Sequence, residues 1–275
     1  MKKILKKIII FMRLQTVAYK IFDLYSYFFR FVTVSRDGIT YALDLQESVD
    51  RGIFLLGWEP LTINWLNSNL KSGDKVIEVG ANVGAHSLII SNLIGPKGLL
   101  YAFEPTNYAY SKLKTNFNLN PDLIKNTQLI QLFVSDKDNA KSNSKIRSSW
   151  IVNKSDDLAD EMDENFDGSI VNLDNFFEDL DSLKLLKIDV DGFDFKVLQG
   201  AEMLISNLKP IVFIELGEKD LQKNGDSVED IINFFHKLEY SGMLESGEQI
   251  LSYGQVLDLM ENRTHINGIF TYKKL

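Results

Sequence analysis

The 275-residue chain contains no cysteine. This absence excludes a disulfide framework, a zinc site built on thiolates and any mechanism that uses a cysteine nucleophile. Proline and glycine are also sparse, with 5 and 17 residues, and 45% of the residues are hydrophobic. The composition therefore excludes collagen-like and low-complexity classes and indicates a folded globular protein.

Long hydrophobic runs are missing as well. The longest apolar run in the first 32 residues spans residues 8–12, far short of the roughly 20 residues that a membrane-spanning helix needs. No small-residue cleavage site follows it, so a signal peptide is not indicated. We expect a cytoplasmic protein, with the inner face of a membrane as an alternative location.

Basic residues are in deficit, with 30 Lys and Arg against 38 Asp and Glu, a net charge of −8. This balance disfavours nucleic acid as a partner, because the phosphate backbone repels an acidic surface. The charge is uneven, since residues 1–32 carry seven basic residues and one acid, a net +6. The acidic remainder therefore carries −14.

Residues 1–32 are predicted to form a basic amphipathic helix, with apolar residues at three- and four-residue spacing. These are Ile4, Ile8, Phe11, Ala18, Ile21, Tyr25 and Phe28. Three roles remain open for residues 1–30: peripheral contact with an anionic membrane, packing on the rest of the chain, or contact with a second copy in a homodimer. Residues 33–60 are predicted to be a small β lead-in, with a hairpin turn at residues 36–38.

Residues 61–275 alternate apolar strand-like runs with helical periods. This alternation is typical of an α/β fold, with a mostly parallel sheet covered by helices on both faces. The expected strands are residues 75–79, 99–103, 128–134, 183–190, 211–216 and 268–273, and the expected helices are residues 85–94, 108–119, 193–208 and 228–240. Residues 136–169 break the pattern with a dense acidic run, which is read as a solvated loop or as a lid beside the site.

A glycine turn joins the first of these strands to its helix. Gly80 and Gly84 permit a tight turn and close approach of a ligand to the backbone. The dinucleotide fingerprint Gly-x-Gly-x-x-Gly is absent, because Asn82 occupies the middle glycine position. A nicotinamide oxidoreductase is therefore a weaker hypothesis than a protein that binds another nucleotide-like ligand.

Two carboxylates near this loop favour S-adenosylmethionine. Glu78 precedes the loop by two residues and would repel a pyrophosphate but attract the ammonium group of that ligand. Glu104 ends the second strand, where α/β folds grip a ribose diol, and Pro105 holds it extended. We also expect Asp136, just after the third strand, to lie near the adenine amino group.

A second group of acids follows the later strands. Asp189 and Asp191 stand at the end of the fourth strand, and Glu215 stands in the fifth. Parallel strands deliver such residues to one edge, where they could orient a hydroxyl, deprotonate it or hold a divalent cation through oxygen ligands. Asp191 has an alternative role as the cap of the next helix. The requirement for a metal is left open.

Together these segments resemble the FkbM-type S-adenosylmethionine-dependent methyltransferases. The resemblance covers about residues 34–275 and is carried by EVGANVGAHS (78–87), YAFEP (101–105), LKTNFNLN (113–120), VNLDNF (171–176), LLKIDVDGFDFKVLQGA (185–201) and KPIVFIEL (209–216). It implies the class I methyltransferase fold, which is Rossmann-like with a seven-stranded sheet. It also implies methyl transfer, usually to an oxygen of a sugar, a glycan or a secondary metabolite.

The expected site then divides by role. The residues expected to bind the cofactor are Glu78, Gly80, Ala81, Asn82, Gly84, His86, Glu104, Pro105 and Asp136, and the residues expected to be catalytic are Asp189, Asp191 and Glu215. His86, beside the loop, is a rival general base, although a helix N-terminus lowers its proton affinity. The alternative function is a catalytically idle methyltransferase fold that acts at a membrane surface or in a complex.

Overall fold

A computed structural model describes residues 21–55, 57–138, 145–147, 163–165, 169–250, 252–261 and 263–273. Its centre is an eight-stranded sheet with the order β13-β12-β14-β11-β10-β3-β4-β5. The strands are β3 (Lys75–Val79), β4 (Leu99–Phe103), β5 (Thr127–Ile130), β10 (Leu185–Ile188), β11 (Ile211–Leu216), β12 (Tyr240–Leu244), β13 (Gln249–Ile250) and β14 (Ile266–Tyr272). The five strands from β5 to β11 run parallel, and β14, β12 and β13 pair antiparallel.

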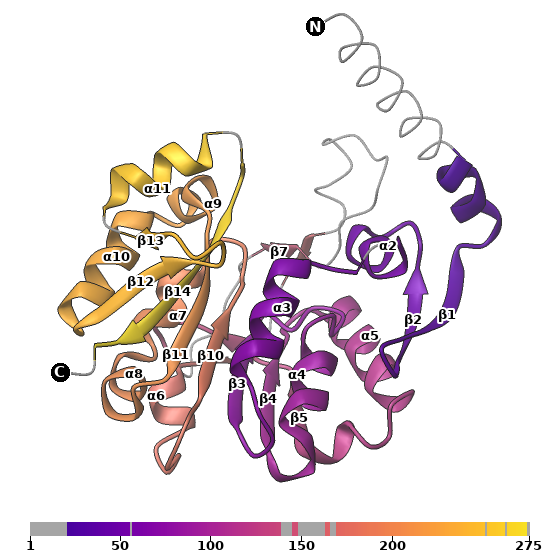
Figure 1. Cartoon of the computed structure of the whole chain (residues 1–275), viewed down its shortest axis with the longest axis horizontal. Helices are drawn as coiled ribbons and strands as arrows, with labels where there is room; N and C mark the ends of the chain where they lie inside the picture. Colours follow the sequence, from indigo (N-terminus) through magenta and orange to yellow (C-terminus); the bar gives the residue numbers. More distant parts are fainter. Residues whose placement is uncertain are drawn as a thin grey trace, which may run out of the picture.

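Helices cover both faces of this sheet (Figure 1). The described helices are α2 (Ser48–Leu55), α3 (Pro60–Asn69), α4 (Ser87–Ile94), α5 (Asn107–Asn118), α6 (Leu173–Phe176), α7 (Asp194–Gln199), α8 (Glu202–Leu208), α9 (Glu218–Lys223), α10 (Val228–Lys237) and α11 (Tyr253–Met260), with 3-10 turns η1 (Gly95–Lys97) and η2 (Ile124–Asn126). One core packs α2 to α5 on the sheet, and the other packs α6 to α11. The predicted α/β class, the mostly parallel sheet and the helices on both faces are confirmed.

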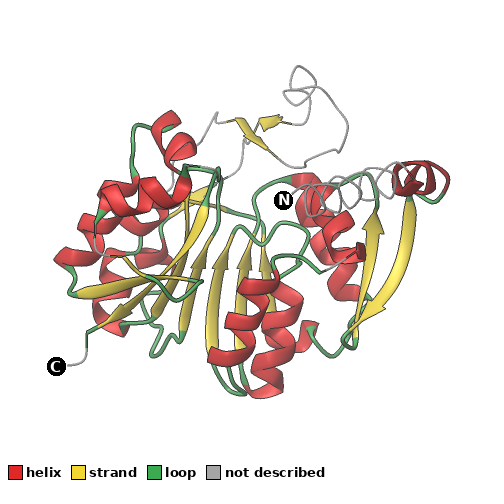
Figure 2. Ribbon diagram, turned by 45° about the horizontal axis from the view of Figure 1, so that its top comes forward, coloured by secondary structure: helices red, strands yellow, loops and turns green. Residues whose placement is uncertain are grey.

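The parallel strands end at one edge of the sheet (Figure 2). Glu104 and Asp189 directly follow β4 and β10, and Glu215 is the next-to-last residue of β11. The topology thus brings acids that are far apart in sequence to one edge, as expected for parallel strands. The two-residue strand β13 adds an eighth strand to the seven that were expected.

Three predicted elements differ from the structure. The predicted strand 128–134 divides into β5 and β6 (Phe133–Val134), and β6 pairs with β9 (Ile170–Val171) in a separate sheet. The predicted helix 193–208 divides into α7 and α8 near Gly200, where a Cβ atom would lie 2.1 Å from the Ser135 carbonyl oxygen. The predicted helix 228–240 ends at Lys237, because Glu239 turns left-handed (φ 63°) and β12 begins at Tyr240.

The predicted hairpin is present at the N-terminal side of the described chain. Strands β1 (Phe31–Arg36) and β2 (Ile39–Asp44) pair antiparallel around the turn. The segment that follows is helical rather than β, because Val49 and Ile53 of α2 lie one turn apart and bury the same face. Residues 21–28 are also helical, and the first part of the predicted N-terminal helix lies outside the described residues.

The polar segment 136–169 is described only in part. Strands β7 (Lys145–Arg147) and β8 (Asp163–Asn165) pair antiparallel. Its reading as a loop or a lid therefore stays a prediction. Within the described ranges, no helix has both the length and the hydropathy to cross a bilayer.

Candidate functional site

The glycine turn after β3 is fixed by close backbone contacts. Gly80 is left-handed (φ 91°), and a Cβ atom there would lie 1.8 Å from the carbonyl oxygen of Asp189. The backbone N–H groups of Gly80 and Ala81 both donate to the Phe103 carbonyl. A side chain at position 80 would therefore push the loop away from the ends of β4 and β10. Gly84 is also left-handed, and a Cβ atom there would meet Leu113 of α5 at 2.8 Å.

Glu104 ties the glycine turn to the end of β4. One carboxylate oxygen accepts the backbone N–H of Asn82 (2.9 Å), and the other accepts the backbone N–H and hydroxyl of Thr106 (2.9 and 2.6 Å). Asn82 itself is left-handed (φ 48°). These bonds fix the Glu104 carboxylate at the end of β4, and its contact with a ligand hydroxyl stays a prediction.

Glu78 is turned into the protein rather than toward solvent. Its side chain is 1% exposed, accepts the Ser87 hydroxyl (2.5 Å) and lies 3.7 Å from the Lys187 ammonium group. The strand register makes this pair, because Glu78 of β3 stands directly opposite Lys187 of β10. The charge partner of Glu78 is thus within the chain, and its direct contact with a ligand ammonium group stays a prediction.

Lys187 also fixes the side chain of Asp189 at the end of β10. The Lys187 ammonium donates to Asp189 Oδ2 (3.0 Å), and the Asp189 side chain is 33% exposed. Burial opposes ionisation of Asp189, but the charge and hydrogen bond of Lys187 outweigh it and keep the Asp189 pKa below its usual value. Burial likewise opposes the charge of Lys187, yet Asp189, Glu78 and Glu59 together raise its pKa. Asp189 is therefore a charged carboxylate that reaches solvent.

Glu59 joins the site from a distant segment and was not predicted. It precedes α3 in a left-handed conformation (φ 44°), accepts the Thr62 hydroxyl (3.2 Å) and lies 3.7 Å from His86 Nε2. Burial and the charge of Asp189 raise its pKa to about 7. The only local signal for Glu59 was an acid just before a proline, which marks a helix start and not a site.

His86 is buried beside this group. Its Nε2 atom makes no hydrogen bond in the described structure. Burial and the Lys187 ammonium group lower the His86 pKa to about 3. His86 is thus a neutral imidazole at physiological pH and a poor general base, which weakens the rival hypothesis.

Glu215 and two further aspartates complete the acidic edge. Glu215 lies 3.6 Å from His265 Nδ1, and burial together with Asp189, Asp194 and Asp191 raises its pKa well above its usual value. Asp194 accepts the backbone N–H groups of Val190 and Gly192 (3.3 and 3.0 Å), so it fixes the turn after β10. Asp191 is exposed and left-handed (φ 49°), and the alternative role as helix cap is wrong, because the N-cap residue of α7 is Phe193 and no side chain caps it.

Asp136 and Pro105 are placed less directly. Asp136 follows β6 and not the main sheet, is exposed and accepts the Ser135 hydroxyl (2.9 Å). Pro105 separates Glu104 from Thr106, and both of these are buried. Contact of Asp136 with an adenine stays a prediction. Among the residues that the structure describes, no three His, Asp or Glu side chains are arranged to hold a metal ion, and metal dependence stays open.

The fold is the α/β type of the class I methyltransferases. A glycine turn and several acids lie at the carboxyl ends of its parallel strands. The family model "Methyltransferase FkbM domain" matches residues 78–241, more than half of the chain. The chain belongs to the FkbM methyltransferase family. None of the curated proteins is a significant match.

Several solved structures are similar to the chain. The FkbM methyltransferase of Methylobacillus flagellatus is 16% identical with a TM-score of 0.45, over 72% of this chain and 43% of that one. An rRNA methylase of Streptococcus thermophilus is 13% identical with a TM-score of 0.45, over 78% and 95%. M. jannaschii TYW2 in complex with AdoMet is 13% identical with a TM-score of 0.41, over 89% and 87%. The family assignment rests on the family model and not on these similarities.

Proposed function

We propose that this methyltransferase uses S-adenosylmethionine to methylate a hydroxyl group of a sugar, a glycan or a secondary metabolite. The observation that carries the proposal is Asp189, a partly exposed carboxylate that Lys187 keeps charged beside the glycine turn. The absence of cysteine and the acidic net charge support a small-molecule or glycan acceptor over nucleic acid.

The residues present fit this cofactor. Glu104 stands at the end of β4, the position at which α/β folds place a carboxylate for ribose hydroxyls, and its position is fixed by Asn82 and Thr106. Because Gly80 has no side chain, the glycine turn packs directly against the backbone of Asp189 at the end of β10. A cofactor bound on this turn would therefore lie near Asp189. When bound, the cofactor supplies an electrophilic methyl group on a sulfonium.

Positioning is the main task left to the protein. The acceptor oxygen must lie in line with the carbon–sulfur bond, and such alignment can supply about 7 to 11 kcal/mol of the barrier. As the new carbon–oxygen bond forms and the carbon–sulfur bond breaks, the acceptor hydroxyl loses its proton. A carboxylate that accepts a hydrogen bond from this hydroxyl both orients it and stabilises its developing positive charge.

The site divides this work between acids of different pKa. Asp189 has a lowered pKa, so it is suited to orient the hydroxyl rather than to remove its proton. Glu59 has a pKa of about 7, and Glu215 has a raised pKa. We assign Glu59 as the group that receives the proton, because a base works best when its pKa lies near the working pH, and Glu215 as an assisting acid on the same edge.

The test uses labelled S-adenosylmethionine and a fractionated glycan and metabolite extract of the host. We expect label in an O-methyl group and expect Asp189→Asn to lose about a hundredfold or more of the turnover while it still binds the cofactor. Asp181→Asn is the matched control, since Asp181 is an exposed carboxylate that also pairs with a lysine. Turnover of Asp189→Asn equal to that of the control contradicts the catalytic assignment.

The same assay distinguishes the proposed enzyme from the alternative, a catalytically idle methyltransferase fold. A catalytically idle fold would transfer no label to any fraction, although it could still bind the cofactor. Label on nitrogen instead of oxygen would retain the methyltransferase and refute the acceptor that we propose.

A further inference from the structure

Residues 21–31 expose many large apolar side chains. Seven large apolar side chains of this segment are exposed, including Tyr27, Phe28 and Phe31 at 72%, 69% and 74%. The others are Ile21, Leu24, Tyr25 and Phe29. Half of the exposed large apolar residues of the described chain therefore lie within eleven positions, and a surface of this kind marks an interaction site.

The opposite side of the segment is anchored to the body of the protein. Phe22 packs on the ring of Phe54 (5.7 Å between centroids) and lies under the guanidinium group of Arg51 (4.6 Å). Ser26 on the same side is buried. One face of this segment thus packs on the body of the protein, and its other face exposes the apolar side chains to solvent.

Both charged residues of this segment are turned toward the body. Asp23 forms an ion pair with Arg51. Arg30 donates from Nε to both carboxylate oxygens of Asp44 and from Nη2 to one of them (2.8 to 3.0 Å). The exposed side chains between Asp23 and Arg30 are aromatic or aliphatic. A water-facing helix usually has the reverse arrangement, with charged side chains outward.

The sequence next to this surface is strongly basic. Residues 1–20 contain six Lys and Arg residues and no Asp or Glu. Apolar and aromatic side chains beside a cluster of cations are typical of segments that bind in the interface of anionic bilayers. The net charge of +6 that this sequence carries is complementary to the negative charge of such a bilayer.

We propose that this surface, formed by the exposed residues of 21–31, docks the enzyme on an anionic lipid bilayer, and that the basic sequence preceding it adds electrostatic attraction. The helical segment lies toward the same end of the molecule as the carboxyl ends of the parallel strands (Figure 2). The proposal does not depend on the methyl acceptor, since it concerns a surface outside the strand-end acids.

The test is flotation of the full-length protein with vesicles. We expect binding to vesicles with about 30% anionic lipid, little binding to zwitterionic vesicles, and weaker binding at about 0.5 M salt, where charges are screened within a few ångströms. The variant Tyr27→Ser/Phe28→Ser/Phe31→Ser should lose at least about tenfold in vesicle affinity, because it removes three apolar anchors.

The matched control is Leu119→Ser/Met203→Ser/Met243→Ser, which changes three exposed apolar residues on other elements. The control should bind vesicles as the parent protein does, and circular dichroism should show both variants folded. Equal binding by the two variants, equal binding to both kinds of vesicle, or no binding by the parent overturns the proposal. A parent dimer that becomes a monomer in the Tyr27 variant, without vesicle binding, assigns the surface to a second copy instead.

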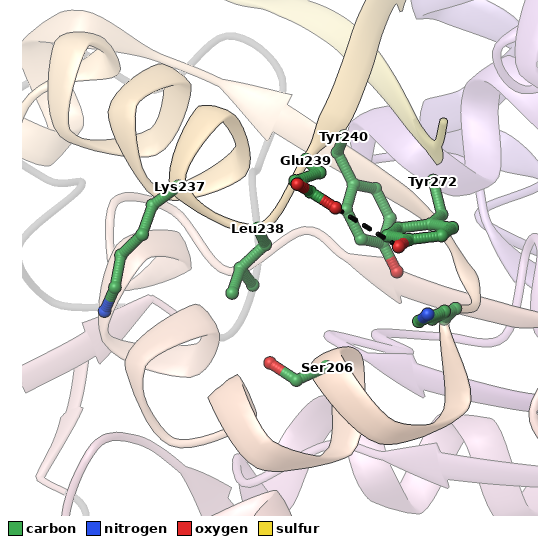
Figure 3. A pocket seen from close by; sticks show the side chains of 7 residues that line it. Ser206, Lys237, Leu238, Glu239, Tyr240 and Tyr272 are labelled. Atoms are coloured by element: carbon green, nitrogen blue, oxygen red, sulfur yellow. Dashed lines mark hydrogen bonds between the residues drawn. The ribbon is translucent and has the colours of Figure 1, made fainter. Parts of the chain in front are cut away.

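A second surface was compared with this one. Ser206, Lys209, Lys237, Leu238, Glu239, Tyr240 and Tyr272 line a pocket of about 240 Å³ (Figure 3). Its polar groups are paired with one another: Lys237 with Glu202, Tyr272 with Glu239, and Lys209 over the Tyr272 ring. Nothing in the described structure points to a ligand in this pocket, and it carries no proposal.

Discussion

Replacement of Lys187 by methionine tests the electrostatic reasoning about the site. In the parent protein the Lys187 side chain is 2% exposed and lies between the carboxylates of Glu78 and Asp189. Removal of the ammonium group leaves buried carboxylate charge without its partner, a change that typically costs about 3 to 5 kcal/mol of unfolding free energy. The apolar chain of methionine fills similar space, so packing loss is a small part of the effect.

The pH dependence of this loss has a defined sign. The pKa of Asp189 is lowered in the folded state, so its contribution is present above the unfolded pKa of 3.8 and is lost as pH falls. The Lys187 pKa is raised, so its contribution is fully present below 10.5. Without Lys187, the two carboxylates relieve their repulsion by binding protons. The destabilisation should therefore be greater at about pH 8 than at about pH 5.

Urea denaturation at both pH values measures the effect. Lys75→Met is the matched control, because Lys75 starts the strand next to β10 and pairs with Asp181 on the surface. Such an exposed pair contributes at most about 1 kcal/mol. A loss for Lys187→Met no larger than that of the control, or one that does not change with pH, would refute the reasoning.

Two further substitutions test single residues. Glu104→Ala should weaken binding of S-adenosylmethionine by about 1.5 to 3 kcal/mol in calorimetry, because it removes a charged hydrogen-bond acceptor, and an unchanged affinity would contradict the ribose assignment. Glu59 has a pKa raised from 4.5 to about 7, so its stabilising contribution is present below 4.5 and is lost as pH rises toward 7. Glu59→Gln should therefore flatten the decline in unfolding free energy over that range, whereas Glu202→Gln on the surface should not, and superimposable curves for Glu59→Gln and the parent would exclude the shift.

The local sequence pattern was sufficient to predict those strands whose hydrophobic run is bounded at both ends by turn residues. Strands β3, β4 and β11 begin and end at the predicted residues. Their hydrophobic runs are short and are bounded by turn residues, so few alternatives compete. The edge shared by Glu104, Asp189 and Glu215 also followed from sequence, because parallel strands can only be connected so that their carboxyl ends coincide.

Elements fixed by distant contacts were not predictable in the same way. The break between α7 and α8 depends on Ser135, whose carbonyl meets Gly200 across more than sixty residues of sequence. The end of α10 depends on a left-handed Glu239, a conformation that nothing in the residue type indicates. The predicted helix 228–240 extends three residues beyond the end of α10 and covers the first residue of β12, and β12 was missed for this reason.

The site was incomplete for a related reason. Lys187 lies in an apolar strand run, and its function depends on strand register, which places it opposite Glu78. Glu59 reaches the site from a segment before the first strand of the sheet, and its partner Thr62 also accepts a hydrogen bond from Asn267 (3.3 Å), more than two hundred residues later. Pairings over such distances leave no signal in a single sequence.

The charge arrangement at the strand ends reconciles acids of opposite pKa in one site. Lys187 contacts Asp189 at 3.0 Å and keeps it charged, and burial together with the charge of Asp189 raises the pKa of Glu59 and Glu215. Lys187 thus keeps one carboxylate charged, and two acids with raised pKa values lie in the same charged group. Lys187 lies in β10 and Glu215 lies in β11. The pairing of these two parallel strands therefore brings the buried cation and an acid with a raised pKa into one site.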